Sequence, residues 1–148
     1  MTTAGKLTEG RPVFAVQQTA TVFDAVAYMA EKNVGAIAVL DGNRLVGILS
    51  ERDVITRVVA KRLPPEEIPV ERVMTRNLVV AETGESKESC LRKMKAANCR
   101  HLPIVGGEEL LGVISLRDLL QVELTDRDET LEVLHNYLFH LPPRLREE

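Results

Sequence analysis

The stretch "LVGILSERD" (residues 45–53) returns 65 residues later as "LLGVISLRD" (residues 110–118). Each copy is an apolar run interrupted by one glycine and followed by Ser-x-Arg-Asp. Short apolar runs of this length are typical of buried β-strands, and a serine followed three residues later by an acid is typical of a helix N-terminus. The sequence therefore predicts the same strand-to-helix junction twice in one chain.

The repeat extends beyond these nine residues. With an offset of 65 and no gaps, eight positions between 29 and 53 carry the same residue in both copies. Ordinary composition would give roughly one or two such matches by chance. The pairs are Met29 and Met94, Asn33 and Asn98, Gly42 and Gly107, Leu45 and Leu110, Gly47 and Gly112, Ser50 and Ser115, Arg52 and Arg117, and Asp53 and Asp118. We conclude that the chain contains two copies of one structural unit, so the fold should consist of two similar halves.

Each copy predicts the order β-α-β-β-α. Helices are expected after the candidate caps Thr21 and Ser86, and again over about 51–60 and 116–123. Asp-Gly and Gly-Gly turns between apolar runs indicate a hairpin in each copy. The predicted strands cover 13–16, 36–40 and 45–49 in the first copy, and 78–80, 101–105 and 110–114 in the second.

These elements predict a division of the chain into four parts. They are a first repeat over 8–62, a linker over 63–72, a second repeat over 73–124 and an amphipathic C-terminal helix over 125–141. One repeat alone would bury too little surface to be secure. We therefore expect an α+β fold in which two pseudosymmetric repeats pack sheet to sheet around a cleft, while the C-terminal helix lies on its own module or on a partner chain.

Composition excludes several classes of function. A formal net charge of -3 with 3% aromatic residues argues against a nucleic-acid partner. No run of about 18 apolar residues indicates a membrane span, and residues 1–10 lack the apolar core of a signal peptide, so we expect a cytoplasmic protein. No nucleophile with an adjacent base and no glycine-rich phosphate loop occurs. We therefore expect a protein that is not an enzyme and that requires no cofactor or metal.

The repeated Ser-x-Arg-Asp admits two interpretations. Serine with an acid three residues later forms a capping box, which needs no ligand. Alternatively, a helix N-terminus offers free N–H groups to a phosphate, and an aspartate can accept both hydroxyls of a ribose. The glycine in each preceding strand would then let something approach the backbone closely.

Three further stretches make the chain resemble a known family. The "VMTRNLVVAE" of 73–82, the "RHLPIV" of 100–105 and the "LLGVISLRDLL" of 110–120, in the order β-α-β-β-α, are similar to a tandem pair of cystathionine β-synthase (CBS) domains, a Bateman module. The resemblance covers about residues 8–124 and points to the small stand-alone bacterial type. It implies an adenosine ligand (AMP, ADP, ATP, NAD or S-adenosylmethionine) between the repeats, a homodimer, and energy or redox sensing passed to an effector protein not yet known.

The resemblance also implies roles for individual residues. Asp118 would hold the ribose, and Ser115 and Arg117 would face the phosphate. The base would lie against a set of apolar residues: Leu78, Val79, Val80, Leu102 and Pro103. The counterparts in the pseudosymmetric site would be Asp53, Ser50, Arg52, Val13, Phe14, Ala36 and Ile37.

The two predicted sites are not equal. Arg100 and His101 are placed to neutralise phosphate, and the sequence leaves open which of the two pockets they serve. The first copy carries Gly35 and Ala36 at the same positions, with Arg52 or Arg57 as substitute cations. We therefore expect the Asp118 site to be favoured. The alternative is a structural or oligomerisation protein that acts through its C-terminal helix without a ligand.

Overall fold

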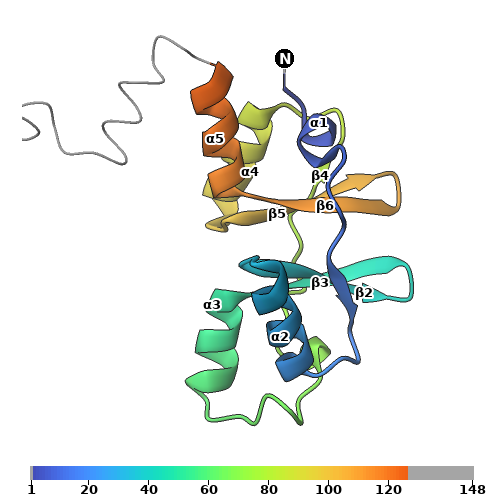
Figure 1. The fold of residues 1–148 in the computed structure, drawn as a ribbon, viewed down its shortest axis with the longest axis vertical. Helices are drawn as coiled ribbons and strands as arrows, with labels where there is room; N and C mark the ends of the chain where they lie inside the picture. Colours follow the sequence, from blue (N-terminus) through green and yellow to red (C-terminus); the bar gives the residue numbers. More distant parts are fainter. Residues whose placement is uncertain (1, 127–148) are drawn as a thin grey trace, which may run out of the picture.

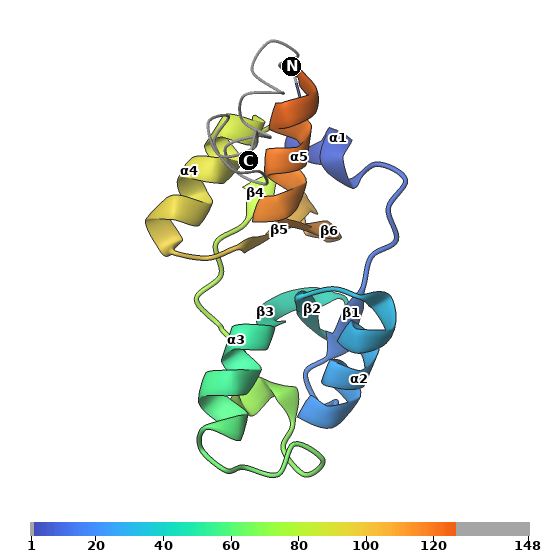
Figure 2. The ribbon, with the colours of Figure 1, turned by 60° about the vertical axis from the view of Figure 1, so that its left-hand side comes forward.

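The protein folds into two three-stranded sheets that face each other, each covered on its outer side by helices (Figures 1 and 2). The structure, a computed structural model, describes residues 2–126. It confirms the α+β fold and the duplicated β-α-β-β-α order. In each sheet the middle strand pairs parallel with the first and antiparallel with the third. The strands are β1 (Ala15–Gln17), β2 (Ala36–Asp41), β3 (Arg44–Ser50), β4 (Ala81–Glu82), β5 (His101–Gly106) and β6 (Glu109–Ser115).

The first strand of each sheet begins later than the sequence predicts. The expected strands covered 13–16 and 78–80, but β1 starts at Ala15 and β4 at Ala81. The amide of Leu78 donates to the carbonyl of Arg76, in a turn, and the pairing with β5 starts where Ala81 meets Ile104. The apolar residues 78–80 are partly buried, as their character indicates. They are not part of the strand, because a segment can be buried without pairing with a neighbouring strand.

The first helix of each repeat has the predicted start. The hydroxyls of Thr21 and Ser86 accept hydrogen bonds from backbone amides in the first turns of α2 (Val22–Lys32) and α4 (Lys87–Ala97). Both helices end at an asparagine in the left-handed conformation, with φ of 55° at Asn33 and 53° at Asn98. Asparagine tolerates this conformation better than most residues, which explains one of the repeated identities.

The second helix of each repeat is also confirmed. In the first repeat α3 (Glu51–Val54) continues into a π-helical turn, η1 (Ile55–Val59), and in the second α5 spans Leu116–Asp126. The remainder of the predicted C-terminal helix, residues 127–141, lies outside the described residues. None of the described helices is both long and apolar enough to cross a membrane.

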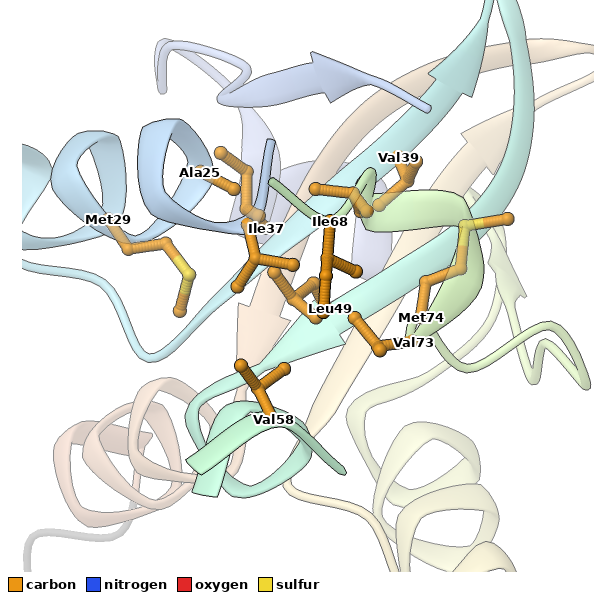
Figure 3. Packing of buried hydrophobic residues seen from close by; sticks show 11 residues of the cluster. Ala25, Met29, Ile37, Val39, Leu49, Val58, Ile68, Val73 and Met74 are labelled. Atoms are coloured by element: carbon orange, nitrogen blue, oxygen red, sulfur yellow. The ribbon is translucent and has the colours of Figure 1, made fainter. Parts of the chain in front are cut away.

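Each repeat has its own apolar core. In the first, α2, β2, β3 and the linker contribute buried side chains that meet beneath the sheet (Figure 3). The second core includes Cys90, Met94, Leu102, Ile104, Ile114 and Leu119. Met29 and Met94 are 5% and 2% exposed, which confirms that these repeated methionines are core residues.

The segments that precede the repeats cross over. Helix α1 (Ala4–Thr8) lies on the second sheet, where Ala4 is fully buried and its amide donates to the Glu85 carbonyl at 2.8 Å. The predicted linker instead completes the first core, with Ile68 and Val70 buried and a short 3-10 turn, η2 (Val70–Arg72). Figure 1 shows the chain running between the two layers twice, once after α1 and once before β4. Each repeat is therefore closed by the segment that precedes the other repeat in the sequence.

The repeated glycines explain how these segments fit. A Cβ added to Gly47 would lie 2.5 Å from the Met74 sulfur, and one added to Gly112 would lie 3.1 Å from Cγ2 of Thr8. Contacts that short leave no room for a side chain at position 47. The close approach predicted at these glycines is therefore made by the chain's own crossing segments.

Candidate functional site

Both Ser-x-Arg-Asp junctions form a complete capping box. The Ser50 amide donates to Oδ2 of Asp53 at 3.0 Å, and the Asp53 amide donates to the Ser50 hydroxyl at 3.2 Å. The same two bonds in the second copy measure 2.8 and 3.0 Å, between Ser115 and Asp118. The cap alone thus explains why serine and aspartate recur at this spacing, and it leaves further lone pairs on each carboxylate.

The Asp53 carboxylate is enclosed. The residue is 7% exposed, and the hydroxyl of Thr75 lies 3.2 and 3.3 Å from its two oxygens. The guanidinium of Arg57 lies 3.6 Å from Oδ1 and donates to the Val73 carbonyl at 2.9 Å. Asp53 therefore ties the segment that follows the linker, at Thr75, to the first repeat.

The Asp118 carboxylate is more open. Its side chain is 27% exposed, and Arg11 holds it in a bidentate ion pair with N–O distances of 2.9 and 3.2 Å. Burial is the largest single influence on the pKa of Asp118 and raises it, but the hydrogen bonds from Arg11 and from the Ser115 amide outweigh burial and hold the pKa below its ordinary value. Asp118 is therefore a carboxylate at neutral pH.

A cavity of about 270 Å³ lies beside this ion pair. It opens between α1 and α5, and its lining is Lys6, Leu7, Arg11, Asp118, Gln121 and Val122. Because the carboxylate of Asp118 and the guanidinium of Arg11 both border it, a small polar molecule can reach them from this side.

His101 lies where the two repeats meet. A Cβ on Gly35 would be 3.3 Å from its Nε2 and 3.4 Å from a carboxylate oxygen of Glu51, so the imidazole of the second repeat reaches the first. Burial lowers the pKa of His101, the carboxylates of Glu51 and Asp118 raise it and Arg100 lowers it, with a net value below the ordinary one. The imidazole is therefore neutral at pH 7 in this conformation.

The other residues predicted for the site fall into two groups. Arg52, Arg100 and Arg117 are exposed, Val13 is 43% exposed, and Phe14, Leu78, Val79 and Val80 are half-buried. Ile37 and Leu102 are fully buried in the two cores, and Ala36 and Pro103 are buried as well. In this conformation Ile37 and Leu102 have no exposed surface that a ligand could contact.

Two residues that contact the aspartates were not predicted, Arg11 and Thr75. The offset of 65 places Arg11 opposite Arg76, an identity that could have drawn attention to Arg11, whereas Thr75 falls opposite Gly10 and carries no such signal. Over residues 2–126 there is no group of three or more His, Cys, Asp or Glu side chains able to hold a metal ion.

The duplicated fold and its junctions agree with a known family. The sequence model of the CBS domain matches the chain twice, at residues 8–60 and 70–125. The chain belongs to the CBS domain family. The two matches make it a tandem CBS pair.

Known CBS proteins are similar to this chain in both sequence and fold. A CBS domain-containing protein of Arabidopsis thaliana is 35% identical over 118 residues, which cover 79% of this chain and 22% of that protein. The chain thus spans about a fifth of this curated relative. A solved structure of a protein with CBS domains from Burkholderia ambifaria is 33% identical, with a TM-score of 0.79, covering 85% of this CBS pair and 96% of that chain.

A third relative was solved with a ligand. It is a CBS domain protein of Pyrobaculum aerophilum complexed with AMP, 27% identical, with a TM-score of 0.73. The alignment covers 85% of this CBS pair and all of that chain.

Proposed function

We propose that this CBS pair is a regulatory module that binds an adenine nucleotide between its repeats, with the ribose on Asp118. The observation that supports the proposal most is the Asp118 carboxylate itself, which is ionised, partly exposed and bordered by a cavity at the start of α5. An aspartate in this setting can accept two ribose hydroxyls. The solved relative from Pyrobaculum aerophilum with bound AMP supports the same class of ligand.

The repeated arginines give a second line of support. The fold accounts for most of the repeated identities. The methionines are buried, the asparagines end helices in the left-handed conformation, and the serines and aspartates form the caps. One pair of glycines lies in the hairpin turns, and the other lies where a crossing segment packs against the strand. Arg52 and Arg117 belong to neither apolar core and are exposed in the first turn of a helix. A guanidinium beside free helix N–H groups suits a phosphate, and this is the role that we assign to Arg117.

The proposal extends to the role of the whole protein. We infer a cytoplasmic sensor of energy or redox state that responds to AMP, ADP, ATP or NAD(H) and acts on a separate effector protein, without catalysis of its own. A ligand bound between two halves can bias their relative arrangement only through a difference in affinity for the two arrangements.

We also propose a homodimer. Three large apolar side chains on helices of the first repeat are exposed: Phe23 by 54%, Ile55 by 61% and Val59 by 64%. Ile55 and Val59 lie four residues apart in η1 and so share one face, which a second copy would cover. Light scattering should show a dimer that Ile55→Ser with Val59→Ser converts to a monomer. A monomeric parent would contradict this part of the proposal.

Thermal unfolding tests nucleotide binding directly. The protein is freed of co-purified ligand and heated with AMP, ADP, ATP, NAD, NADH or S-adenosylmethionine. A ligand present at a hundred times its dissociation constant adds about 2.7 kcal/mol to the free energy of unfolding, a rise of roughly 5 to 10 °C for a chain of this size.

The matched variants are Asp118→Asn and Asp53→Asn. Asparagine keeps an oxygen for the capping bond but removes the charge. We expect Asp118→Asn to abolish the shift and Asp53→Asn to keep most of it. If no adenosine compound shifts the parent, the alternative of a structural or oligomerisation protein is favoured instead.

A further inference from the structure

Arg11 occupies the oxygens that a ribose would need. Its two terminal nitrogens lie 2.9 and 3.2 Å from Oδ1 and Oδ2 of Asp118, one on each oxygen. A bidentate guanidinium–carboxylate pair is geometrically specific and stronger than a neutral hydrogen bond. A ligand that places its ribose hydroxyls on Asp118 must therefore first displace Arg11.

The repeat itself does not require this ion pair. The counterpart of Arg11 in the offset alignment is Arg76, which turns away from Asp53 and donates to the Glu71 carbonyl at 2.7 Å. At Asp53 the neutral hydroxyl of Thr75 serves as donor, and its counterpart beside Asp118 is Gly10, which has no side chain. At Asp118 an arginine binds both carboxylate oxygens, whereas at Asp53 the Thr75 hydroxyl is within hydrogen-bond distance of both oxygens and the Arg57 guanidinium lies further away, at 3.6 Å.

The cost of displacing Arg11 depends on the charge of the ligand. Adenosine can take over the carboxylate through its hydroxyls, but it offers the guanidinium no anion in exchange. A nucleotide carries its own phosphate, to which a guanidinium binds bidentately as well as to a carboxylate. Lys6 lines the same cavity and adds a second positive charge on the side where Arg11 lies.

We propose that Arg11 is a specificity-determining residue, which makes the Asp118 site take phosphate-bearing adenine nucleotides in preference to adenosine. The inference rests on the proposed function, because it concerns the same site. It goes further by assigning selection among adenosine compounds to a residue outside the Ser-x-Arg-Asp sequence, contributed by the segment that crosses from the N-terminus.

Calorimetric titration of the full chain with adenosine and with AMP tests the inference. The measured quantity is the ratio of the adenosine dissociation constant to the AMP dissociation constant. In Arg11→Ala we expect adenosine to bind roughly three- to tenfold more tightly, since the competing ion pair is partly exposed and so of moderate strength. AMP should bind no more tightly than before, so the ratio falls.

Two further variants make the result specific. Arg76→Ala removes the arginine at the equivalent position of the other repeat, and its ratio should equal that of the parent. Arg11→Lys keeps the charge but loses the bidentate geometry, and should give a ratio between those of the parent and Arg11→Ala. The thermal unfolding of each variant without ligand shows that it is folded.

The possible outcomes separate the two proposals. A parent that binds AMP, with the same ratio in Arg11→Ala as in the parent, would overturn the role of Arg11 and leave the proposed function standing. The same fall of the ratio in Arg76→Ala would also overturn it, because the effect would then be one of general charge. If neither compound binds the parent or Arg11→Ala, both proposals are wrong.

Discussion

Asp53 and Asp118 end the same repeated sequence and cap equivalent helices, but their neighbours hold them in different ways. Asp53 is buried beneath Thr75 and Arg57, whereas Asp118 is partly exposed and held by Arg11 alone besides its cap. The difference comes from the residues packed over the caps, which are Thr75 and Arg57 at Asp53 and Arg11 at Asp118. Both repeats keep the cap. The residues packed over it enclose Asp53, whereas they leave Asp118 accessible to a ligand that could replace Arg11.

The largest effect that separates the two aspartates is on stability. Asp53→Ala should lower the free energy of unfolding by about 3 kcal/mol, because it leaves the Ser50 amide and the Thr75 hydroxyl without their acceptor in a buried place and removes the ion pair with Arg57. Asp118→Ala should cost about 1 kcal/mol, the usual cost of losing a cap, since water can replace the rest. Urea unfolding measures both. Equal losses would show that the enclosure of Asp53 contributes nothing.

A second comparison concerns the two cores. The offset of 65 aligns Lys87 and Glu123 with Val22 and Val58, which are fully buried. In the second repeat the two valines are thus replaced by an ion pair, with 3.0 Å between Nζ of Lys87 and Oε2 of Glu123. The side chain of Lys87 is 9% exposed and that of Glu123 is 20% exposed. Lys87→Met should cost about 2 kcal/mol, because Glu123 would remain half-desolvated without this partner.

The double variant sharpens that comparison. Lys87→Val with Glu123→Val rebuilds the pair of the first repeat, and it should be more stable than Lys87→Met because no charge is left behind. Chemical unfolding of the single and double variants gives the coupling between the two positions. Losses that simply add would mean that the two charges do not interact across the core.

The smallest effect is the pH dependence from His101, which has Ala36 as its counterpart in the first repeat. Because its pKa in the folded protein lies below the ordinary value of about 6.5, the unfolded chain binds the proton more readily. The stabilisation from the neutral imidazole is therefore full above pH 6.5 and is lost as the pH falls through the folded pKa. His101→Gln should flatten this part of the curve of unfolding free energy against pH. An unchanged curve would show that burial does not lower the pKa of His101 in the folded protein.

The duplication, the hairpins and the helix caps could be predicted from the sequence because each has a local signal. Thr21 and Ser86 cap the helices that they were expected to cap, and the Gly42 and Gly107 turns join the expected strands. The Ser-x-Arg-Asp junctions were also located correctly. Local chemistry fixes these features whatever the rest of the chain does.

The partners of the two aspartates could not be predicted in the same way. Thr75 lies 22 residues from Asp53 and Arg11 lies 107 residues from Asp118, and their contacts depend on which repeat each connecting segment covers. Nothing in the composition of residues 2–12 or 63–75 states that choice. The start of β4 was misplaced for a similar reason, because the partner strand sets where pairing begins, and the apolar run of 78–80 is buried without it.

The crossing of the two connecting segments has a consequence for how the molecule comes apart. A cut between residues 62 and 63 would divide the sequence at a repeat boundary but would remove Ile68, Val70 and Met74 from the core that they fill. The second half would equally lose Ala4 from its own core. The sequence repeat is thus not the cooperative unit, and neither half should survive excision. The chain should melt in one transition, and a circular permutant would have to keep both crossings to fold.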